Sequence, residues 1–114
     1  MISSDLQDYP YLHSDFGGDP ELGDLVELFV AEMPDRIRRV LSHVATGDWE
    51  NLVRSAHQLK GAAGSYGFHQ LTRPARRLEE SATKREPEQQ IQAAVDELVM
   101  LCERLRSGPA PQSK

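Results

Sequence analysis

The sequence predicts an all-α domain, an antiparallel up-down four-helix bundle with a short N-terminal extension. Leucine, alanine, glutamate and arginine are frequent, and aromatic residues make up only 6% of the 114 residues, which favours helices over a β-sandwich or barrel. Apolar residues recur at spacings of three and four in four separate stretches. The connections between them are short, and an antiparallel bundle is the simplest way to bury four apolar stripes.

The first long helix is expected to begin at Asp19, because an aspartate cap followed by Pro20 is a favourable helix start. Pro34 is expected to bend this helix or to split it in two. Gly47 should end it. Its apolar stripe comprises Leu22, Leu25, Phe29, Met33, Ile37, Val40 and Val44.

The second helix is expected from about Trp49, after a cap at Asp48, with Trp49 as a packing anchor. Its buried side comprises Leu52, Ala56, Leu59 and Ala63.

Two further helices complete the bundle. Pro74 requires the third helix either to start near Thr72 or to bend, since a proline beyond the first turn removes a hydrogen bond. The fourth helix should start near Pro87. Their apolar stripes comprise Leu71, Ala75, Leu78 and Ala82 in the third and Ile91, Val95, Leu98, Cys102 and Leu105 in the fourth.

The bundle is expected over residues 19–106. Residues 1–18 are polar and end in Gly17 and Gly18, which indicates a loose lead. Residues 107–114 have the composition of a flexible tail.

Charge and composition exclude several classes of function. The formal net charge of −5 disfavours binding to nucleic acid or to an anionic membrane. Cys102 is the only cysteine and lies on an apolar stripe, so we expect a core residue and no internal disulfide. There is no long apolar run and no metal-binding spacing of His and Cys, and the first residues lack the basic flank and apolar centre of a signal peptide, so none is expected. A soluble cytoplasmic protein without a metal site is the expectation.

The second helix carries a histidine that points away from its apolar stripe, because His57 lies about 160° around the helix axis from Leu59. Gly61 and Gly64 fall within about 40° of His57 on the same outward face. Each interior glycine costs roughly 1 kcal/mol against alanine, so two of them suggest that something approaches the backbone there. Lys60 adds a cation beside the ring, which suits an imidazole that handles an anion.

The chemistry that fits these residues is phosphoryl transfer. A neutral imidazole is a competent nucleophile, and a neighbouring lysine compensates charge on the phosphoryl oxygens. The chain has no glycine-rich loop for ATP, so it is expected to be a phosphocarrier and not an autonomous kinase. The phosphoryl group would have to come from another protein.

The run HQLKGAAGSYG, residues 57–67, matches the signature H-x-L-K-G-x-(small)-x-x-x-G, and the chain thereby resembles histidine-containing phosphotransfer (HPt) domains of multistep two-component signalling. Three flanking segments also resemble the family: LFVAEMPDRI its F-x-x-E-x-P helix, TGDWENL its capped turn, and GFHQLTRPARRLEE its next helix. The resemblance covers about residues 20 to 105.

The resemblance implies that His57 accepts the phosphoryl group and that Lys60 stabilises the phosphoryl oxygens. Gly61 and Gly64 would clear space for the active site of the partner. Glu79 matches a position near the histidine where relatives carry glutamate or glutamine; it would accept the Nδ1 proton and leave Nε2 to attack, or it is a solvated helix residue.

Arg76 faces the same way one turn before that glutamate, where it would help with phosphate or is simply solvated. Val53 and Phe68 are candidate docking contacts, although Phe68 fits the core equally well. The chain departs from the family at Ala62 and Ala63, where serine is frequent, and at Pro74, which makes the placement of Arg76 and Glu79 less certain.

The partners implied are response-regulator receiver domains, which hold their own Mg²⁺, and a hybrid histidine kinase, with this chain as a monomer that needs no cofactor of its own. Two alternatives stay open. The run GSYGF also resembles the phosphotransfer domains of chemotaxis-type histidine kinases. The second alternative is a helical adaptor that binds signalling partners without transferring phosphate.

Overall fold

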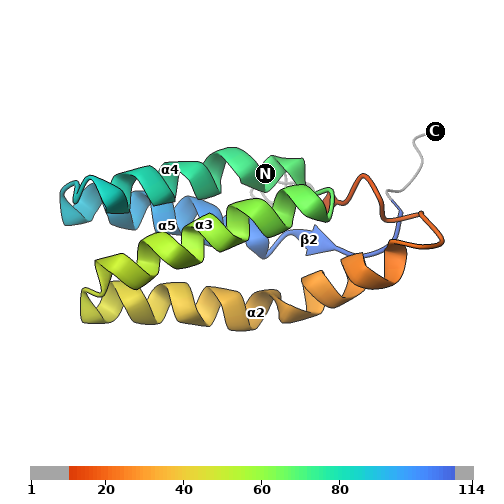
Figure 1. Cartoon of the computed structure of the whole chain (residues 1–114), viewed down its shortest axis with the longest axis horizontal. Helices are drawn as coiled ribbons and strands as arrows, with labels where there is room; N and C mark the ends of the chain where they lie inside the picture. The colour runs from red at the N-terminus through yellow and green to blue at the C-terminus, as the bar shows by residue number, and fades with distance from the viewer. Residues whose placement is uncertain (1–10, 110–114) are drawn as a thin grey trace, which may run out of the picture.

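The computed structural model describes residues 11–109, and within them four long helices run alternately up and down (Figure 1). They are α2 (Gly23–Thr46), α3 (Trp49–Ser65), α4 (Thr72–Thr83) and α5 (Glu88–Cys102), with a short 3₁₀ helix, η1 (His69–Leu71), directly before α4. The predicted all-α antiparallel bundle is therefore confirmed.

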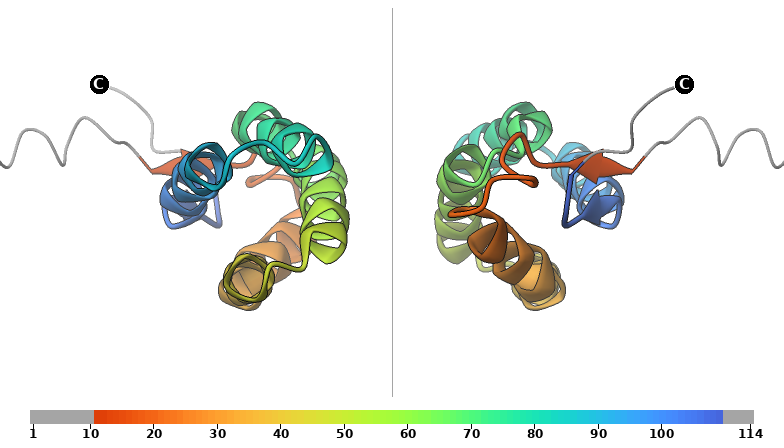
Figure 2. Two further views of the ribbon diagram at one scale, coloured as in Figure 1. Left: turned by 90° about the vertical axis from the view of Figure 1, so that its left-hand side faces the viewer. Right: turned by 90° about the vertical axis from the view of Figure 1, so that its right-hand side faces the viewer.

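The four helices lie in sequence order along an arc when the molecule is viewed end-on (Figure 2). The ends of the arc are α2 and α5, and α3 and α4 lie side by side between them (Figure 2). The apolar faces of all four helices point into the arc and form one core. Its largest fully buried side chains are Phe29, Phe68, Leu52, Leu71, Leu78, Ile91, Leu98, Val26 and Val95.

Helix α2 differs from its prediction at its first turn. The side chain of Asp19 accepts hydrogen bonds from the backbone N–H groups of Glu21 and Leu22, at 2.7 and 2.9 Å, but this capped turn only precedes the regular helix, which begins at Gly23. The predicted stripe is also wrong at one position, because Leu25 is 44% exposed while Val26 is fully buried in its place. The two residues are 100° apart, and the centre of the core lies closer to Val26.

The remaining helix boundaries follow the predicted signals. Helix α2 continues through Pro34 as a single helix and ends at Gly47, whose φ of 68° is the left-handed conformation that glycine adopts easily. Asp48 caps α3 by accepting a hydrogen bond from the backbone N–H of Asn51. Helix α4 begins at Thr72, which places Pro74 in the first turn, where its missing N–H costs nothing.

The segment before α2 lies against the bundle from residue 11 onwards, although a loose lead was expected there. Two short strands, β1 (Leu12–His13) and β2 (Leu105–Arg106), pair in parallel, so Leu105 is buried in a strand and not on the last helix. The hydroxyl of Ser14 donates to the carbonyl of Tyr66 at 2.5 Å, and the N–H of Asp15 donates to the carbonyl of Gly67 at 3.0 Å. These bonds fix the turn at the C-terminal end of α3. Residues 1–10 of the expected lead and 110–114 of the expected tail lie outside the described residues.

Candidate functional site

Helix α3 places His57 on the surface and buries the opposite side of the helix in the core. Leu59 is 3% exposed, whereas 66% of the His57 side chain is accessible to solvent. Gly61 and Gly64 follow on the outward face, and a Cβ atom built on either of them would have no neighbouring atom within 4 Å. The backbone beyond His57 is therefore bare and open, as the sequence predicted.

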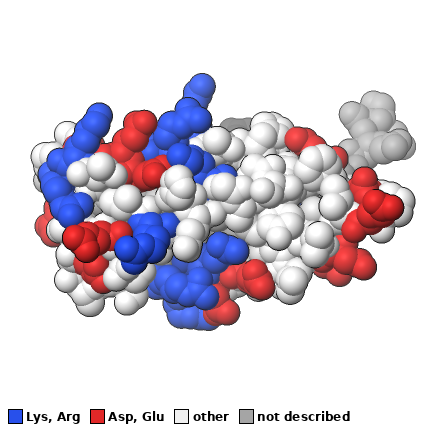
Figure 3. All heavy atoms as spheres, in the orientation of Figure 1, with Lys and Arg blue, Asp and Glu red and all other residues white. Residues whose placement is uncertain are grey.

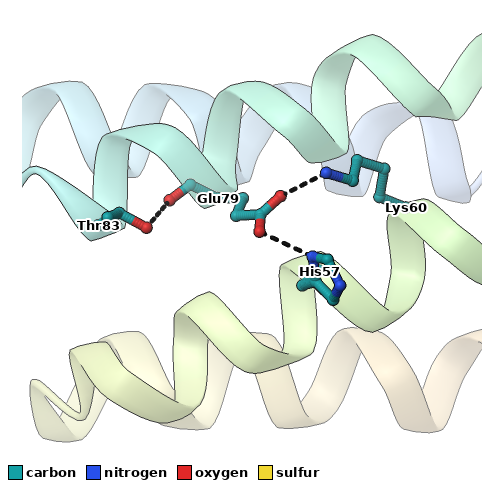
Figure 4. Close-up of polar contacts among 4 residues, drawn as sticks. All are labelled: His57, Lys60, Glu79 and Thr83. Carbon is teal, nitrogen blue, oxygen red and sulfur yellow. Dashed lines mark hydrogen bonds and ion pairs between the residues drawn. The ribbon is translucent and has the colours of Figure 1, made fainter.

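Helix α4 runs alongside α3 and brings Glu79 to the histidine (Figure 4). One carboxylate oxygen, Oε2, lies 2.8 Å from Nδ1 of His57, and the other, Oε1, accepts a hydrogen bond of 2.8 Å from Nζ of Lys60. The Glu79 side chain is only 20% exposed. Three residues that the sequence separates thus form one hydrogen-bonded cluster with the carboxylate at its centre.

The charge of Glu79 is stabilised by this arrangement. The hydrogen bond from Lys60 is the main cause that holds the pKa of the Glu79 carboxyl below its ordinary value, and the bond from His57 acts in the same direction. Partial burial opposes both effects. At neutral pH the group is therefore a carboxylate, which can only accept hydrogen bonds.

A carboxylate partner fixes the roles of the two ring nitrogens of His57. Because Glu79 can only accept, Nδ1 must carry a proton and donate it, and the neutral ring then holds its lone pair on Nε2. Nε2 points away from Glu79 in Figure 4. The site consequently presents a nucleophilic nitrogen to the outside, with a carboxylate behind the ring to stabilise the positive charge that develops when Nε2 forms a bond.

An open hollow of about 450 Å³ adjoins His57 between α3 and α4. Val53, a predicted docking contact, lies on its wall and is half-buried. Thr83 also lines it, but its hydroxyl is already used, because it donates to the backbone carbonyl of Glu79 at 2.7 Å (Figure 4). The full lining comprises Glu50, Val53, Arg54, His57, Glu79, Thr83 and Arg85.

Two other predicted site residues, Phe68 and Arg76, do not line this hollow. Phe68 is wrong as a docking contact, because it is fully buried and its ring stacks on Phe29 with centroids 5.6 Å apart. It follows the end of α3, where the chain turns inward toward η1, so helical periodicity does not apply to it. Arg76 is exposed and lines a neighbouring hollow of about 310 Å³ together with Lys60 and Glu79.

The sequence reasoning missed Arg54 and Arg85 as residues beside the histidine. Arg54 is three residues before His57 and therefore on the same face of α3, which was a usable signal. Arg85 lies in the turn after α4, and only the fold brings it to the hollow.

Other chemistry finds no support in residues 11–109. Cys102 is buried, and burial raises the pKa of its thiol to about 12, so it is an unreactive core residue as expected. No group of three or more His, Cys, Asp or Glu side chains in this range is arranged to hold a metal ion. None of the helices in this range is long and apolar enough to cross a membrane.

Comparison with known proteins identifies the family. The family model of the Hpt domain matches residues 24–108, which cover α3, α4, α5, the histidine cluster and all of α2 except its first residue. No curated protein and no solved structure gave a significant match. Hpt domains carry out histidine phosphotransfer in two-component systems and interact with response-regulator receivers and kinases. With a match over most of its length, the chain belongs to the Hpt domain family.

Proposed function

We propose that the protein is a phosphorelay intermediate that accepts a phosphoryl group on Nε2 of His57 from an aspartate of a receiver domain and passes it to an aspartate of another receiver. The observation that carries the proposal is the hydrogen bond between Nδ1 of His57 and Glu79, which leaves Nε2 as the free nucleophile.

The transfer replaces the P–O bond to the aspartate of the partner with a bond between phosphorus and Nε2 of His57. The lone pair of Nε2 attacks phosphorus, the P–O bond to the aspartate of the partner breaks, and that aspartate leaves as a carboxylate. The ring becomes positively charged, and Glu79 stabilises it by accepting the hydrogen bond from Nδ1–H. The reverse sequence returns the phosphoryl group to a second receiver.

Lys60 has two roles in this proposal. In the resting state its ammonium group is bound to Oε1 of Glu79, which keeps that carboxylate charged and oriented toward His57. When a phosphoryl group arrives, the same ammonium group lies one helical turn from the ring and compensates the negative charge of the phosphoryl oxygens.

Docking requires a flat approach to the ring. Gly61 and Gly64 provide it, because they remove side chains from the outward face of α3 without opening a gap in the core. The receiver supplies Mg²⁺ and the acid groups of its own site, and this chain acts as a cytoplasmic monomeric carrier with no cofactor of its own.

The experiment is phosphoryl transfer from a panel of aspartate-phosphorylated receiver domains to the wild type and to His57→Gln. We expect label that is labile in acid and stable in base on the wild type, and none on the variant. Receivers that bind both proteins but label neither would contradict the relay and favour the non-transferring adaptor.

A further inference from the structure

Two arginines stand on the walls of the hollow beside His57. Arg54 belongs to α3 and Arg85 to the turn between α4 and α5, and both are exposed. Within residues 11–109, neither of them forms an ion pair with an acidic side chain. Their charges are therefore available to a molecule that covers the hollow.

Arg54 is held in place by a chain of hydrogen bonds along the first two turns of α3. Its Nη1 donates to Oδ1 of Asn51 at 2.7 Å, and Nδ2 of Asn51 donates to Oδ2 of Asp48 at 2.7 Å. The bonds from Asn51 keep the pKa of Asp48 below its ordinary value. This chain uses only one of the five N–H donors of the guanidinium group, so the group is oriented but still able to bind a ligand.

Arg85 lies on the α4 side of the hollow and is held by its backbone conformation and one hydrogen bond. Its backbone φ of 53° places it in the left-handed region, which is unusual for a residue other than glycine. Its Nη1 donates to the carbonyl of Ala82 at 2.7 Å, at the C-terminal end of α4, where a cation is favourable. Again most of the donors of the guanidinium group stay open to solvent.

The charge around the histidine is opposite to that of the whole protein. Of the two acids in the hollow, Glu79 is engaged by Lys60 and His57, which leaves only Glu50 against the two arginines. The adjoining hollow adds Arg76 and Lys84 on the cationic side and Glu80 on the acidic side, so basic side chains still outnumber acidic ones. In Figure 3 Lys and Arg side chains lie over the left and middle of the molecule, with Asp and Glu side chains among them, while the right-hand end shows Asp and Glu only. The net charge of the chain is nevertheless −5.

We propose that Arg54 and Arg85 recognise a carboxylate-bearing rim of the receiver domain that docks over His57. A guanidinium group binds a carboxylate through two parallel hydrogen bonds, which gives both attraction and orientation. The inference rests on the proposed relay function and states which chemistry the partner presents beside its phosphorylated aspartate.

The arginines and the glycines lie on opposite sides of His57, so recognition of the partner and close approach to the ring involve different parts of the surface. Every α3 residue that lines it lies at or before His57, whereas Gly61 and Gly64 lie after it. The docking surface therefore has two halves: bare backbone for close approach on one side of the ring, and two arginines for selection of an acidic partner on the other. Specificity of this kind acts on encounter and orientation more than on the chemical step.

The test compares two phosphoryl donors on the same protein. Phosphoramidate is a small donor whose nitrogen is protonated near neutral pH: the Nε2–P bond forms, the N–P bond of the donor breaks, and the nitrogen leaves as neutral ammonia. It needs no docking surface, so it reports on the reactivity of His57 alone. Aspartate-phosphorylated receiver domains report on reactivity and docking together, and the ratio of the two rates isolates docking.

For the double variant Arg54→Ala/Arg85→Ala we expect the ratio of the receiver rate to the phosphoramidate rate to fall about tenfold at low salt. High salt should lower the wild-type ratio toward that of the variant. Asn51→Ala should cause a smaller loss and keep the salt dependence, since it releases Arg54 without removing its charge. Arg77→Ala is the matched control, because Arg77 pairs with Glu97 and lines neither hollow.

Two failures are distinguishable. If neither donor labels His57 in the wild type, the relay function itself is wrong. If receivers label the wild type and the double variant with the same rate ratio and the same salt dependence, the relay stands and the recognition role of the arginines is overturned.

Discussion

The carboxylate of Glu79 and the imidazole of His57 come from different helices and meet at 2.8 Å between Oε2 and Nδ1. The contact is built on the packing of α4 against α3, and Lys60 holds the second carboxylate oxygen at the same distance. The nucleophile, the group that stabilises its charge and the group that orients that carboxylate thus form one unit.

Glu79→Gln should slow phosphoryl transfer while His57 remains the site of labelling. The amide has nearly the same shape but carries no charge, so it no longer stabilises the positive ring that forms in the transfer. We expect a loss of at least about tenfold in the rate of labelling by phosphoramidate. Glu80→Gln, which changes the adjacent exposed residue, is the control, and equal rates for both variants would contradict the role of Glu79.

The same carboxylate should contribute to stability in a pH-dependent way. Because the pKa of Glu79 is lower in the folded protein than in the unfolded chain, its contribution is present above the unfolded value and is lost as pH falls through the folded value. The difference in unfolding free energy between wild type and Glu79→Gln should therefore shrink from neutral pH toward about pH 3. Denaturant unfolding at several pH values measures it; a difference that stays constant would argue against the cluster.

Gly61→Ala should make the protein more stable and at the same time slow phosphoryl transfer from receivers. The position is helical and a Cβ atom would meet nothing, so alanine should stabilise the fold by about 0.5 to 1 kcal/mol. The new methyl group stands on the docking surface, so transfer from receivers should fall by a larger factor than labelling by phosphoramidate. Thermal unfolding and the two transfer assays test this together. If the variant is more stable and still accepts phosphoryl groups from receivers at the wild-type rate, Gly61 is not needed for docking.

Gly67→Ala should destabilise the protein, by about 1 to 3 kcal/mol. Gly67 has a φ of 82°, and a Cβ atom there would lie 2.5 Å from Oγ of Ser14 and 2.9 Å from a ring carbon of Phe16. Gly47→Ala is the matched comparison, since its φ is also positive but no atom lies within 4 Å of the new group. Denaturant unfolding should show the larger loss at Gly67. Equal losses would mean that the segment around Ser14 does not hold the turn.

The helical fold could be predicted because its signals are local. Apolar spacing defines α3, α4 and α5, while Asp48, Gly47 and Pro74 mark boundaries where the structure has them. Where two neighbours are both apolar, as at Leu25 and Val26, spacing does not decide which is buried, because that depends on how the helices pack. The pairing of β1 with β2 joins the two ends of the described chain and leaves no periodic signal in segments of two residues.

The candidate site also combines features that could be predicted from local sequence with features that depend on how the helices pack. The exposure of His57 and the open backbone at Gly61 follow from the geometry of one helix, so the sequence was sufficient for them. The meeting of Glu79 with His57 depends on two helices and was expected only through the family resemblance. Arg85 reaches the hollow through the turn after α4, which only the folded chain specifies.

The most direct test of the account is to identify the phosphorylated atom. Nuclear magnetic resonance of the phosphoramidate-labelled protein, with ¹⁵N in the histidine rings, distinguishes phosphorylation at Nε2 from phosphorylation at Nδ1 and assigns the residue. The account predicts a single label on Nε2 of His57, because Nδ1 is bound to Glu79. A label on Nδ1 of His57, or on His13, His43 or His69 in its place, would contradict it.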